Sequence, residues 1–295
     1  MNYDFINILN NGNDLAPEME LYFSINERQL LHYYEPELGL FVVESPMVIE
    51  RALNAGYRPV SYVMIDTVAE EMCEKFSKIM DDTKDEWDEK VDSIPVYVGD
   101  YETIAGMTGV NITRGVLALM KRRELPALSD VIENCSRIAV FDDVENPTNI
   151  GAMFRSAAAL GIEAIVLAGQ SCDPLYRRAS RVSTGTVFQV PWTILKSAKG
   201  SGGSGTDEKA EYVRLLRDAG YTTAAMTLSD DSVNIDDPSL KQSEKIAIIM
   251  GNEGYGLSDD VIRSCDYVVK IPMKNNVDSL NVAAASTIAF WEITR

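Results

Sequence analysis

The stretch IAIIMGNEGYGLS, residues 246–258, decides how the fold of this chain is interpreted. Its first five residues are all apolar, which is typical of a buried strand. The strand runs directly into a loop that places Gly251, Gly254 and Gly256 on both sides of Glu253. Glycine allows a backbone to approach a ligand closely or to adopt a positive φ. The stretch therefore predicts a buried strand that ends at a functional loop, with Glu253 as an ordinary surface acid as the alternative.

Short apolar segments alternate with helical segments around this stretch. The expected strands are 138–141, 164–167, 187–190 and 222–226. The expected helices are 149–161, 175–182, 207–219 and 281–294. Short apolar strands between helices are typical of a mostly parallel sheet with helices on both faces. The second half of the chain is therefore predicted to be an α/β domain.

The first half contains a smaller α/β layer. The segment GLFVVESPMVIERALNAG, residues 39–56, predicts a short strand followed by an amphipathic helix, and further strands are expected at 60–65 and 96–98. Residues 66–92 are strongly acidic and predict solvated helices. The predicted organisation is an N-terminal extension (1–35), a small α/β domain (36–120), a polar linker (121–136) and the larger α/β domain (137–295).

Length, charge and histidine content exclude several classes of protein. A chain of 295 residues suits two domains. Its net charge of −18 argues against binding to nucleic acid or to an anionic membrane by bulk charge, but leaves room for a local basic groove. The single histidine, His32, excludes sites with several histidine ligands, and no metal is expected. Neither a signal peptide nor an apolar run of the roughly 20 residues needed to cross a membrane is visible, so a cytoplasmic protein without a membrane partner is expected.

A glycine-rich segment, GSGGSG at 200–205, matches the GxGxxG pattern of dinucleotide-binding proteins. A dinucleotide site needs its first glycine directly after a strand, so that the next helix N-terminus faces a pyrophosphate. Here residues 196–199 separate the segment from the preceding strand, and a pure Gly/Ser composition is typical of a flexible linker. We interpret it as a linker, and a dinucleotide-dependent oxidoreductase is kept only as an alternative.

Two further segments of the second half carry polar residues after predicted strands. Residues 142–161, DDVENPTNIGAMFRSAAALG, place Asn149 at the start of a helix and Arg155 six positions later. Residues 271–286, IPMKNNVDSLNVAAAS, lead through a polar loop to Ser279 before a helix of small residues. Each segment has a structural alternative, since Asn149 and Ser279 are typical helix-cap residues and alanines allow close packing. Neither segment alone indicates a function.

Together and in this order, the three segments resemble the three motifs of the SpoU-type methyltransferases of the SPOUT superfamily. NPTNIGAMFR matches the first motif, MGNEGYGLS the second and IPMKNNVDSLNVAAA the third, and the resemblance covers 137–295. It implies an α/β fold with a trefoil knot, S-adenosyl-L-methionine as cofactor, an RNA substrate and a homodimer. Residues 36–120 more weakly resemble the small substrate-recognition domain of many members, with Ser45 where the family typically has glycine.

The resemblance also assigns roles to residues of this chain. The ribose end of the site would be formed by Asn149 and Arg155, supported by Glu253, Ser279 and Asn281. A guanidinium keeps its positive charge in proteins, so Arg155 is expected to bind and polarise the ribose and an adjacent phosphate. Apolar side chains and backbone groups would hold the cofactor, as is usual in cofactor pockets, at Thr227, Leu228, Gly251, Ile271, Met273 and Leu280.

The leading hypothesis is an RNA methyltransferase that transfers a methyl group to a ribose 2′-hydroxyl of rRNA or tRNA. The alternative from another class is a SPOUT-fold protein that binds RNA or cofactor without catalysis. RNA binding needs local cations, and the expected helix 175–182 carries Arg177, Arg178 and Arg181 as a candidate phosphate-binding stripe, with residues 121–123 (KRR) as a second candidate. Solvated surface arginines are the alternative for the stripe.

Overall fold

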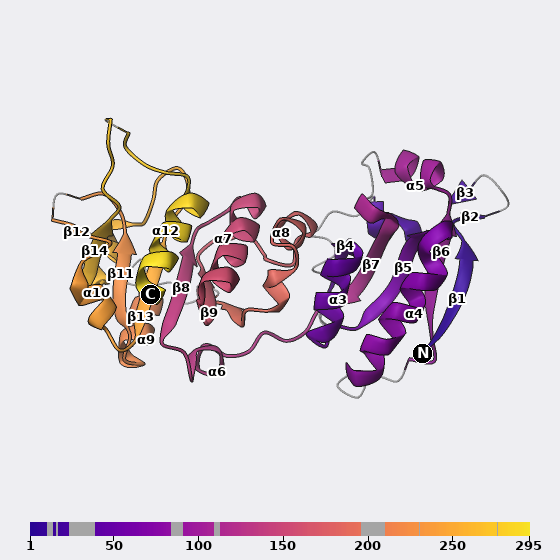
Figure 1. Ribbon diagram of the computed structural model, residues 1–295, viewed down its shortest axis with the longest axis horizontal. Coiled ribbons are helices and arrows are strands. Elements are labelled where there is room, and N and C mark those ends of the chain that lie inside the picture. The colour runs from indigo at the N-terminus through magenta and orange to yellow at the C-terminus, as the bar shows by residue number, and fades with distance from the viewer. Residues whose placement is uncertain are drawn as a thin grey trace, which may run out of the picture. The chain divides into compact units, whose positions relative to one another are not determined.

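The structure is a computed structural model that describes residues 1–10, 14–15, 17–23, 39–83, 91–108, 113–195, 210–229, 231–275 and 277–295. The chain divides into two compact units (Figure 1). Unit 1 contains Met1–Glu124 and Leu175–Gln189, and unit 2 contains Leu125–Pro174 and Val190–Arg295. The stretch 175–189 thus groups with unit 1, although the sequence of unit 2 continues on both sides of it. His32 and segment 200–205 lie outside the described residues.

Unit 1, within its described residues, is built on a five-stranded mixed sheet in the order β1-β6-β5-β7-β4. The strands are β1 (Asn2–Asn7), β4 (Leu40–Glu44), β5 (Pro59–Ile65), β6 (Ser93–Gly99) and β7 (Val116–Lys121). β1, β6 and β5 are parallel, whereas β7 runs antiparallel to β5 and β4. A short hairpin is formed by β2 (Leu9–Asn10) and β3 (Asp14–Leu15).

The helices of unit 1 follow the predicted pattern of strand and helix. Helix α3 (Pro46–Asn54) comes directly after β4, begins with proline in its first turn, and buries Val48, Ile49, Ala52 and Leu53. The acidic segment forms α4 (Asp66–Thr83), so the predicted helix is confirmed over these residues, but it is solvated on one face only, since Phe76 and Met80 are buried. The remaining helices and 3-10 turns are η1 (Pro17–Met19), α1 (Glu20–Phe23), α5 (Tyr101–Thr108), η3 (Thr113–Gly115), α8 (Arg177–Val182) and η4 (Thr186–Phe188).

Unit 2, within its described residues, has a seven-stranded sheet whose pairs are all parallel, in the order β10-β9-β8-β13-β11-β14-β12. The strands are β8 (Arg137–Asp142), β9 (Ala164–Ala168), β10 (Trp192–Ile194), β11 (Thr222–Met226), β12 (Val233–Asn234), β13 (Ile246–Met250) and β14 (Tyr267–Lys270). The helices are α6 (Leu128–Ile132), α7 (Pro147–Leu160), α9 (Glu211–Asp218), α10 (Pro238–Gln242), α11 (Asp259–Ser264) and α12 (Val282–Thr294). The predicted parallel α/β sheet is confirmed.

Helices cover both faces of this sheet, which explains why its strands are apolar throughout. Successive strand residues point to opposite faces. Val140 of β8 belongs to a core cluster with residues of α6, α9 and α11. Phe141, the next residue, instead meets Phe154 of α7 with ring centroids 5.8 Å apart. Helix α7 also contacts α12 through a hydroxyl pair, Ser156 Oγ and Thr287 Oγ1, at 2.7 Å.

The strand predicted at 187–190 is wrong, because this stretch begins with the 3-10 turn η4 and strand β10 follows only later. The turn starts at Gly185, whose φ of 85° is in the left-handed region that favours glycine. The Phe188 ring then packs edge-on against Tyr57, with centroids 5.3 Å apart. A contact with a residue so distant in sequence overrides the local apolar pattern.

Candidate active site

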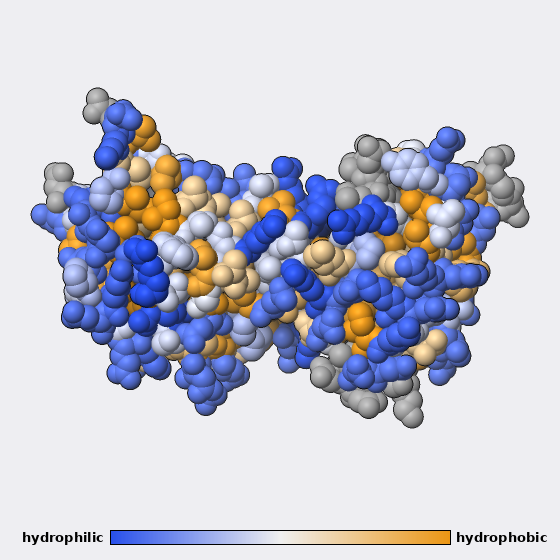
Figure 2. Space-filling model, viewed as in Figure 1, coloured by the Kyte–Doolittle hydropathy of each residue, from blue (hydrophilic) through white to orange (hydrophobic). Residues whose placement is uncertain are grey.

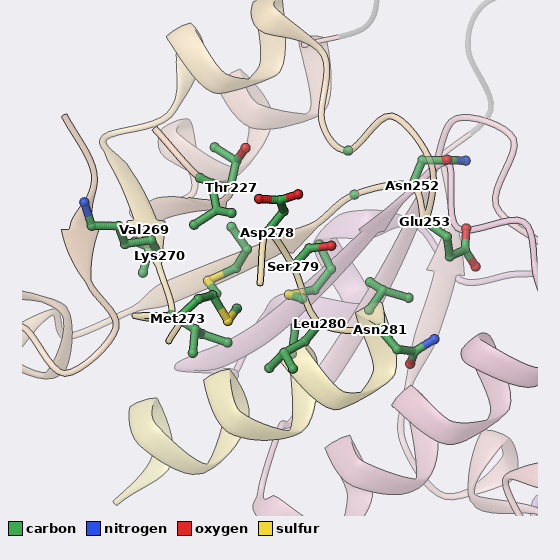
Figure 3. Close-up of a pocket in the computed structure, with 18 of the residues that line it drawn as sticks. Thr227, Asn252, Glu253, Val269, Lys270, Met273, Asp278, Ser279, Leu280 and Asn281 are labelled. Carbon is green, nitrogen blue, oxygen red and sulfur yellow. The ribbon is translucent and has the colours of Figure 1, made fainter. Parts of the chain in front are cut away.

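The carboxyl ends of neighbouring strands in unit 2 surround a cavity of about 510 Å³. Ligands of open parallel α/β sheets bind in this position, outside the carboxyl ends of the strands. The walls come from the ends of β11, β13 and β14, the loops after them and the start of α12 (Figure 3). In this view Glu253 and Asn281 lie at one end of the pocket, and Val269 and Lys270 lie at the other.

All six residues expected to hold a cofactor line this cavity. They come from the loop after β11, the start of the loop after β13 and the segment from β14 to α12: Thr227, Leu228, Gly251, Ile271, Met273 and Leu280. Three residues expected at the ribose end, Glu253, Ser279 and Asn281, line the same cavity. The loop after β11, the loop after β13 and the segment from β14 to α12 therefore meet at this cavity, because β11 lies between β13 and β14 in the sheet.

The loop after β13 is folded tightly on itself. Asn252 and Gly256 exchange two backbone hydrogen bonds, of 3.2 and 3.1 Å, and Asn252 Oδ1 also accepts one from the Gly254 amide at 2.7 Å. A Cβ atom on Gly251 would lie 2.6 Å from the backbone carbon of Gly256 and from the amide nitrogen of Leu257. Glycine at this position is therefore required for the loop to close, in addition to any contact with a ligand.

A chain of side-chain hydrogen bonds joins the three motifs. Asn281 Nδ2 donates to Asn149 Oδ1 at 3.1 Å, and Asn149 Nδ2 donates to Glu253 Oε1 at 2.8 Å. The same carboxylate oxygen accepts a hydrogen bond from the backbone amide of Asn146 at 3.2 Å. Asn149 is 8% exposed, so its amide is held between its two partners. The Glu253 carboxylate is therefore oriented by two donors from the start of α7.

The structure corrects the helix-cap alternatives for Asn149 and Ser279. The cap of α7 is Asn146, whose side chain accepts a hydrogen bond from the Thr148 amide at 2.8 Å, and Asn149 lies inside the first turn. The cap of α12 is Asn281, whose Oδ1 accepts from the Ala283 amide at 3.0 Å, while Ser279 lies two residues earlier in the pocket wall. Asn146 was open to prediction, since asparagine directly before a proline is a typical start of a helix.

Arg155 lies apart from this hydrogen-bonded group. It is on α7, six residues after Asn149, its side chain is exposed, and it does not line the cavity. Among the residues that the structure describes, it forms no hydrogen bond or ion pair, and Glu253 is bonded to asparagines instead. Within the described residues, Arg155 is therefore not paired with Glu253.

Two tyrosines beside the first motif remain neutral phenols. The Tyr212 hydroxyl donates to Asp142 Oδ2 at 2.8 Å, and burial together with the nearby carboxylate raises the pKa of Tyr212 well above its ordinary value. Burial and the carboxylate of Asp143 likewise raise the pKa of Tyr255. Neither tyrosine supplies a phenolate base at neutral pH, so a carboxylate is the better candidate for a general base.

Several residues of the cavity wall were not expected from the sequence. The longer side chains among them are Met226, Met250, Asn252, Val269, Lys270 and Asp278. Met226, Met250 and Lys270 each end a strand, so the predicted strand ends were the available signal for these three. Among the described residues, no group of three or more His, Cys, Asp or Glu residues could hold a metal ion, and no helix is long and apolar enough to cross a membrane.

Of the three α8 arginines in the candidate stripe, Arg177 is partly buried, whereas Arg178 and Arg181 are exposed. Arg177 and Arg181 both form ion pairs with Glu44, which is fully buried. In the second basic candidate, the guanidiniums of Arg122 and Arg123 lie over aromatic rings of unit 1, 5.8 Å from each ring centre.

Comparisons with known proteins agree with the fold. The family model for the SpoU rRNA methylase family matches residues 136–291. An uncharacterized tRNA/rRNA methyltransferase of Mycobacterium tuberculosis is 31% identical over 258 residues, which is 87% of this chain and 81% of the relative. The AdoMet-bound rRNA methyltransferase of Sinorhizobium meliloti has a similar fold, with a TM-score of 0.74, 23% identity and coverage of 99% of this chain and 97% of that chain.

A second solved structure shares the same fold. The SpoU methyltransferase AviRb of Streptomyces viridochromogenes, in complex with AdoMet, has a TM-score of 0.71 at 21% identity and covers 95% of this chain and 98% of that chain. The family match over more than half of the chain and the long alignment with the mycobacterial relative lead to one conclusion. The chain belongs to the SpoU rRNA methylase family and is an RNA methyltransferase.

Proposed function

We propose that this protein transfers a methyl group from S-adenosyl-L-methionine to a ribose 2′-hydroxyl of rRNA or tRNA. The observation that carries the proposal is the chain of hydrogen bonds from Asn281 through Asn149 to Glu253, at the edge of the cavity. Burying a side-chain amide is costly unless it is hydrogen-bonded, and Asn149 has a hydrogen-bond partner on each side. Here it presents an oriented carboxylate beside the pocket.

The cavity suits S-adenosyl-L-methionine in size and chemistry. Its volume of about 510 Å³ lies within the usual range for small-molecule pockets. Apolar side chains such as Leu228, Met273 and Leu280 would pack on the adenine, and polar groups of Thr227 and Ser279 would fix its orientation. The bound cofactor supplies an electrophilic methyl group on a sulfonium sulfur.

In this proposal the residues of the chain position the ribose and take up its proton. Glu253, held by Asn149 and by the amide of Asn146, accepts the proton of the 2′-hydroxyl as a general base. Arg155 binds the ribose and the adjacent phosphate, since a planar guanidinium can donate to both. Its exposed position on α7, without a described partner, keeps it available to a large substrate.

The role of Arg155 has its own test. Arg155→Ala should leave the melting temperature and cofactor affinity nearly unchanged, while methyl transfer falls by at least about 100-fold, the lower range for the loss of a charge-stabilising group. Arg155→Lys should not restore the rate, because an ammonium cannot replace a planar fork. Full activity of Arg155→Ala would remove this residue from the mechanism.

The homodimer is part of the same proposal. Helix α12 exposes Ile288 and Trp291 on one face, with 38% and 53% of each residue accessible. On the face shown in Figure 2, hydrophobic side chains gather around α12 and the loop before it. Trp291→Glu should turn a dimer into a monomer in light scattering at micromolar concentration. A wild-type monomer would contradict the proposal.

The trefoil knot and the cytoplasmic location also stay predictions.

The chemistry of the product tests the function directly. Purified protein, labelled S-adenosyl-L-methionine and total bacterial RNA should give labelled RNA whose nuclease digest contains 2′-O-methylated nucleosides by mass spectrometry. Label in a base would keep the RNA methyltransferase but overturn the ribose proposal. Cofactor binding without any transfer would favour the alternative of a binding protein that lacks catalysis.

A further inference from the structure

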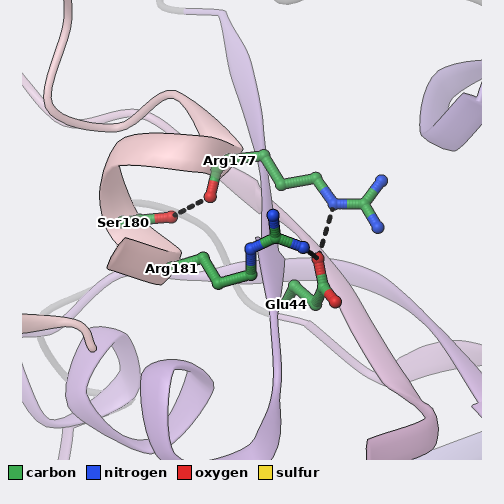
Figure 4. A network of polar contacts seen from close by, with 4 residues as sticks. All are labelled: Glu44, Arg177, Ser180 and Arg181. Atoms are coloured by element: carbon green, nitrogen blue, oxygen red, sulfur yellow. Dashed lines mark hydrogen bonds and ion pairs between the residues drawn. The ribbon is translucent and has the colours of Figure 1, made fainter. Parts of the chain in front are cut away.

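Unit 1 contains a fully buried carboxylate that the proposed reaction does not use. Glu44 is the last residue of β4 and is 0% exposed. A carboxylate is almost never buried unless it is paired, because removing it from water is costly. Its partners come from α8: Arg177 Nε donates to Glu44 Oε2 at 3.0 Å, and Arg181 Nη1 donates to the same oxygen at 3.3 Å (Figure 4). We call these three residues the Glu44 cluster.

The helix that carries both arginines is held firmly in unit 1. Arg51 Nη1 donates to the carbonyl of Thr184, just after α8, at 2.8 Å. Gly185 approaches helix α3 so closely that a Cβ atom there would lie 3.2 Å from the Val48 Cα. These contacts fix the backbone of α8, and Glu44 fixes the ends of its two arginine side chains.

The three side chains of the Glu44 cluster carry two positive charges and one negative charge. Two guanidiniums share one carboxylate, so the cluster carries a net charge of about +1. The side chains of Arg177 and Arg181 are 23% and 43% exposed, whereas Glu44 is not exposed at all. Figure 4 shows the terminal nitrogens of Arg177 pointing away from Glu44. The stretch 175–189 contains three arginines and no acidic residue.

We propose that the Glu44 cluster binds a backbone phosphate of the substrate RNA, with Arg177 and Arg181 as the binding residues and Glu44 as a positioning residue. The inference rests on the proposed function, since it names a contact with the RNA. Guanidinium groups match phosphate oxygens with two parallel hydrogen bonds. Side chains that are already held in place lose less entropy when they bind, so an oriented pair binds phosphate more tightly than two mobile arginines.

Glu44→Gln separates positioning from simple charge. The substitution makes the protein less negative by one charge, so charge alone predicts tighter RNA binding. A neutral amide cannot hold two guanidiniums as a carboxylate does, so the arginines become mobile. Ordering two long side chains costs about tenfold in affinity, which is within the usual range. We therefore expect RNA binding to weaken by about tenfold although the repulsion between protein and RNA decreases.

Glu50→Gln is the matched control. Glu50 lies on α3 in the same unit and pairs with Lys75 at 2.6 Å, but that pair is exposed. The control makes the same charge change as Glu44→Gln without touching the cluster. It should leave RNA affinity unchanged or slightly increased.

The experiment measures binding of deproteinised bacterial ribosomal RNA by filter binding between 50 and 200 mM KCl. Arg181→Gln should weaken binding and reduce the slope of log affinity against log salt by about 0.7–0.9, the value for one lost phosphate contact. Arg181 is chosen because, among the described residues, its side chain bonds only with Glu44. In the variant, Glu44 still has Arg177 as a partner. Arg181→Lys should keep the slope but bind less tightly.

Melting temperature and S-adenosyl-L-methionine affinity, measured on the same preparations, separate binding from folding. Both should change little in Arg181→Gln. If wild-type protein binds RNA and transfers methyl groups, but Arg181→Gln keeps the wild-type salt slope, the cluster is only structural and this proposal is overturned while the proposed function stands. If the wild-type protein neither binds nor methylates RNA, both proposals fail. Tighter binding by Glu44→Gln would overturn the positioning role.

Discussion

Replacing Asn149 with aspartate tests the hydrogen-bond chain at the pocket most directly. The two side chains have the same shape, but aspartate has no N–H to donate. The substitution therefore leaves packing unchanged and converts the 2.8 Å hydrogen bond from Asn149 to Glu253 into a contact between two carboxylates. The bond from Asn281 is kept, because an aspartate oxygen accepts it as well as the amide oxygen does.

The contacts of Asn149 allow the loss of stability in Asn149→Asp to be calculated. A hydrogen bond to a charged group contributes about 1.5–3 kcal/mol, and the lower value applies because Glu253 is exposed. Two charges at 2.8 Å repel by about 1.5 kcal/mol at the dielectric constant of water. The hydrogen bond from Asn281 becomes stronger when its acceptor is a charged aspartate, and this gain offsets part of the sum. The free energy of unfolding should fall by about 2–3 kcal/mol, which lowers the melting temperature by about 5–10 °C for a unit of this size.

Calorimetry at low and high salt is the assay, and Asn146→Asp is the control. In 1 M KCl the screening length is about 3 Å, close to the separation of the two charges, so about half of the repulsive part of the loss should be recovered. The side chain of Asn146 accepts a hydrogen bond from Thr148 and donates none that the structure describes, so the same change there should cost less than about 0.5 kcal/mol. If Asn149→Asp is as stable as this control, the bond to Glu253 does not exist in solution and the proposed orientation of the carboxylate is wrong.

Three further predictions follow from single contacts. Gly251→Ala should destabilise unit 2 and abolish cofactor binding in calorimetry, because its Cβ would lie 2.6 Å from the backbone of 256–257; a stable variant would show that the loop can open. Burial raises the pKa of Cys73 and Cys265 to about 12, so at pH 8 only about one thiol in ten thousand is ionised and both should react slowly with a disulfide reagent until the protein is denatured. Burial alone would raise the pKa of Glu163, but hydrogen bonds from two backbone amides and a serine hydroxyl outweigh it and hold the pKa below 4.5. This carboxylate therefore stabilises the fold above pH 4.5 and loses that effect as the pH falls. Glu163→Gln should have a lower melting temperature than wild type at pH 7, and the two melting temperatures should converge in acid. Equal stability at pH 7 would contradict this prediction.

Most of the fold was predictable because it depends on local patterns. The strands of unit 2 are apolar on both faces, and that pattern is visible in a segment as short as Ile246–Met250. The strand predicted at 187–190 failed because the conformation there depends on Phe188 packing against Tyr57, which lies far away in sequence. No local pattern reports such a contact.

Only part of the candidate site was predictable from the sequence. Residues at strand ends, such as Gly251 and Ile271, line the cavity because parallel strands end at one edge. The Glu44 cluster was not visible in the sequence, since Glu44 looks like the polar end of a strand and its partners follow more than 130 positions later. Burial of a charge is decided by which elements pack together, and the spacing of residues does not contain that information.

The place of residues 175–189 in unit 1 has a consequence for synthesis of the chain. A ribosome that has made residues 1–124 has not yet made α8, and roughly 65 more residues must be added before the stretch 175–189 is complete. At about 5–20 residues per second, this takes about 3–13 s. During this interval the nascent first unit carries a carboxylate at Glu44 without its arginines and a Tyr57 ring without Phe188. Co-translational folding of unit 1 therefore cannot finish before a large part of the methyltransferase sequence has been translated.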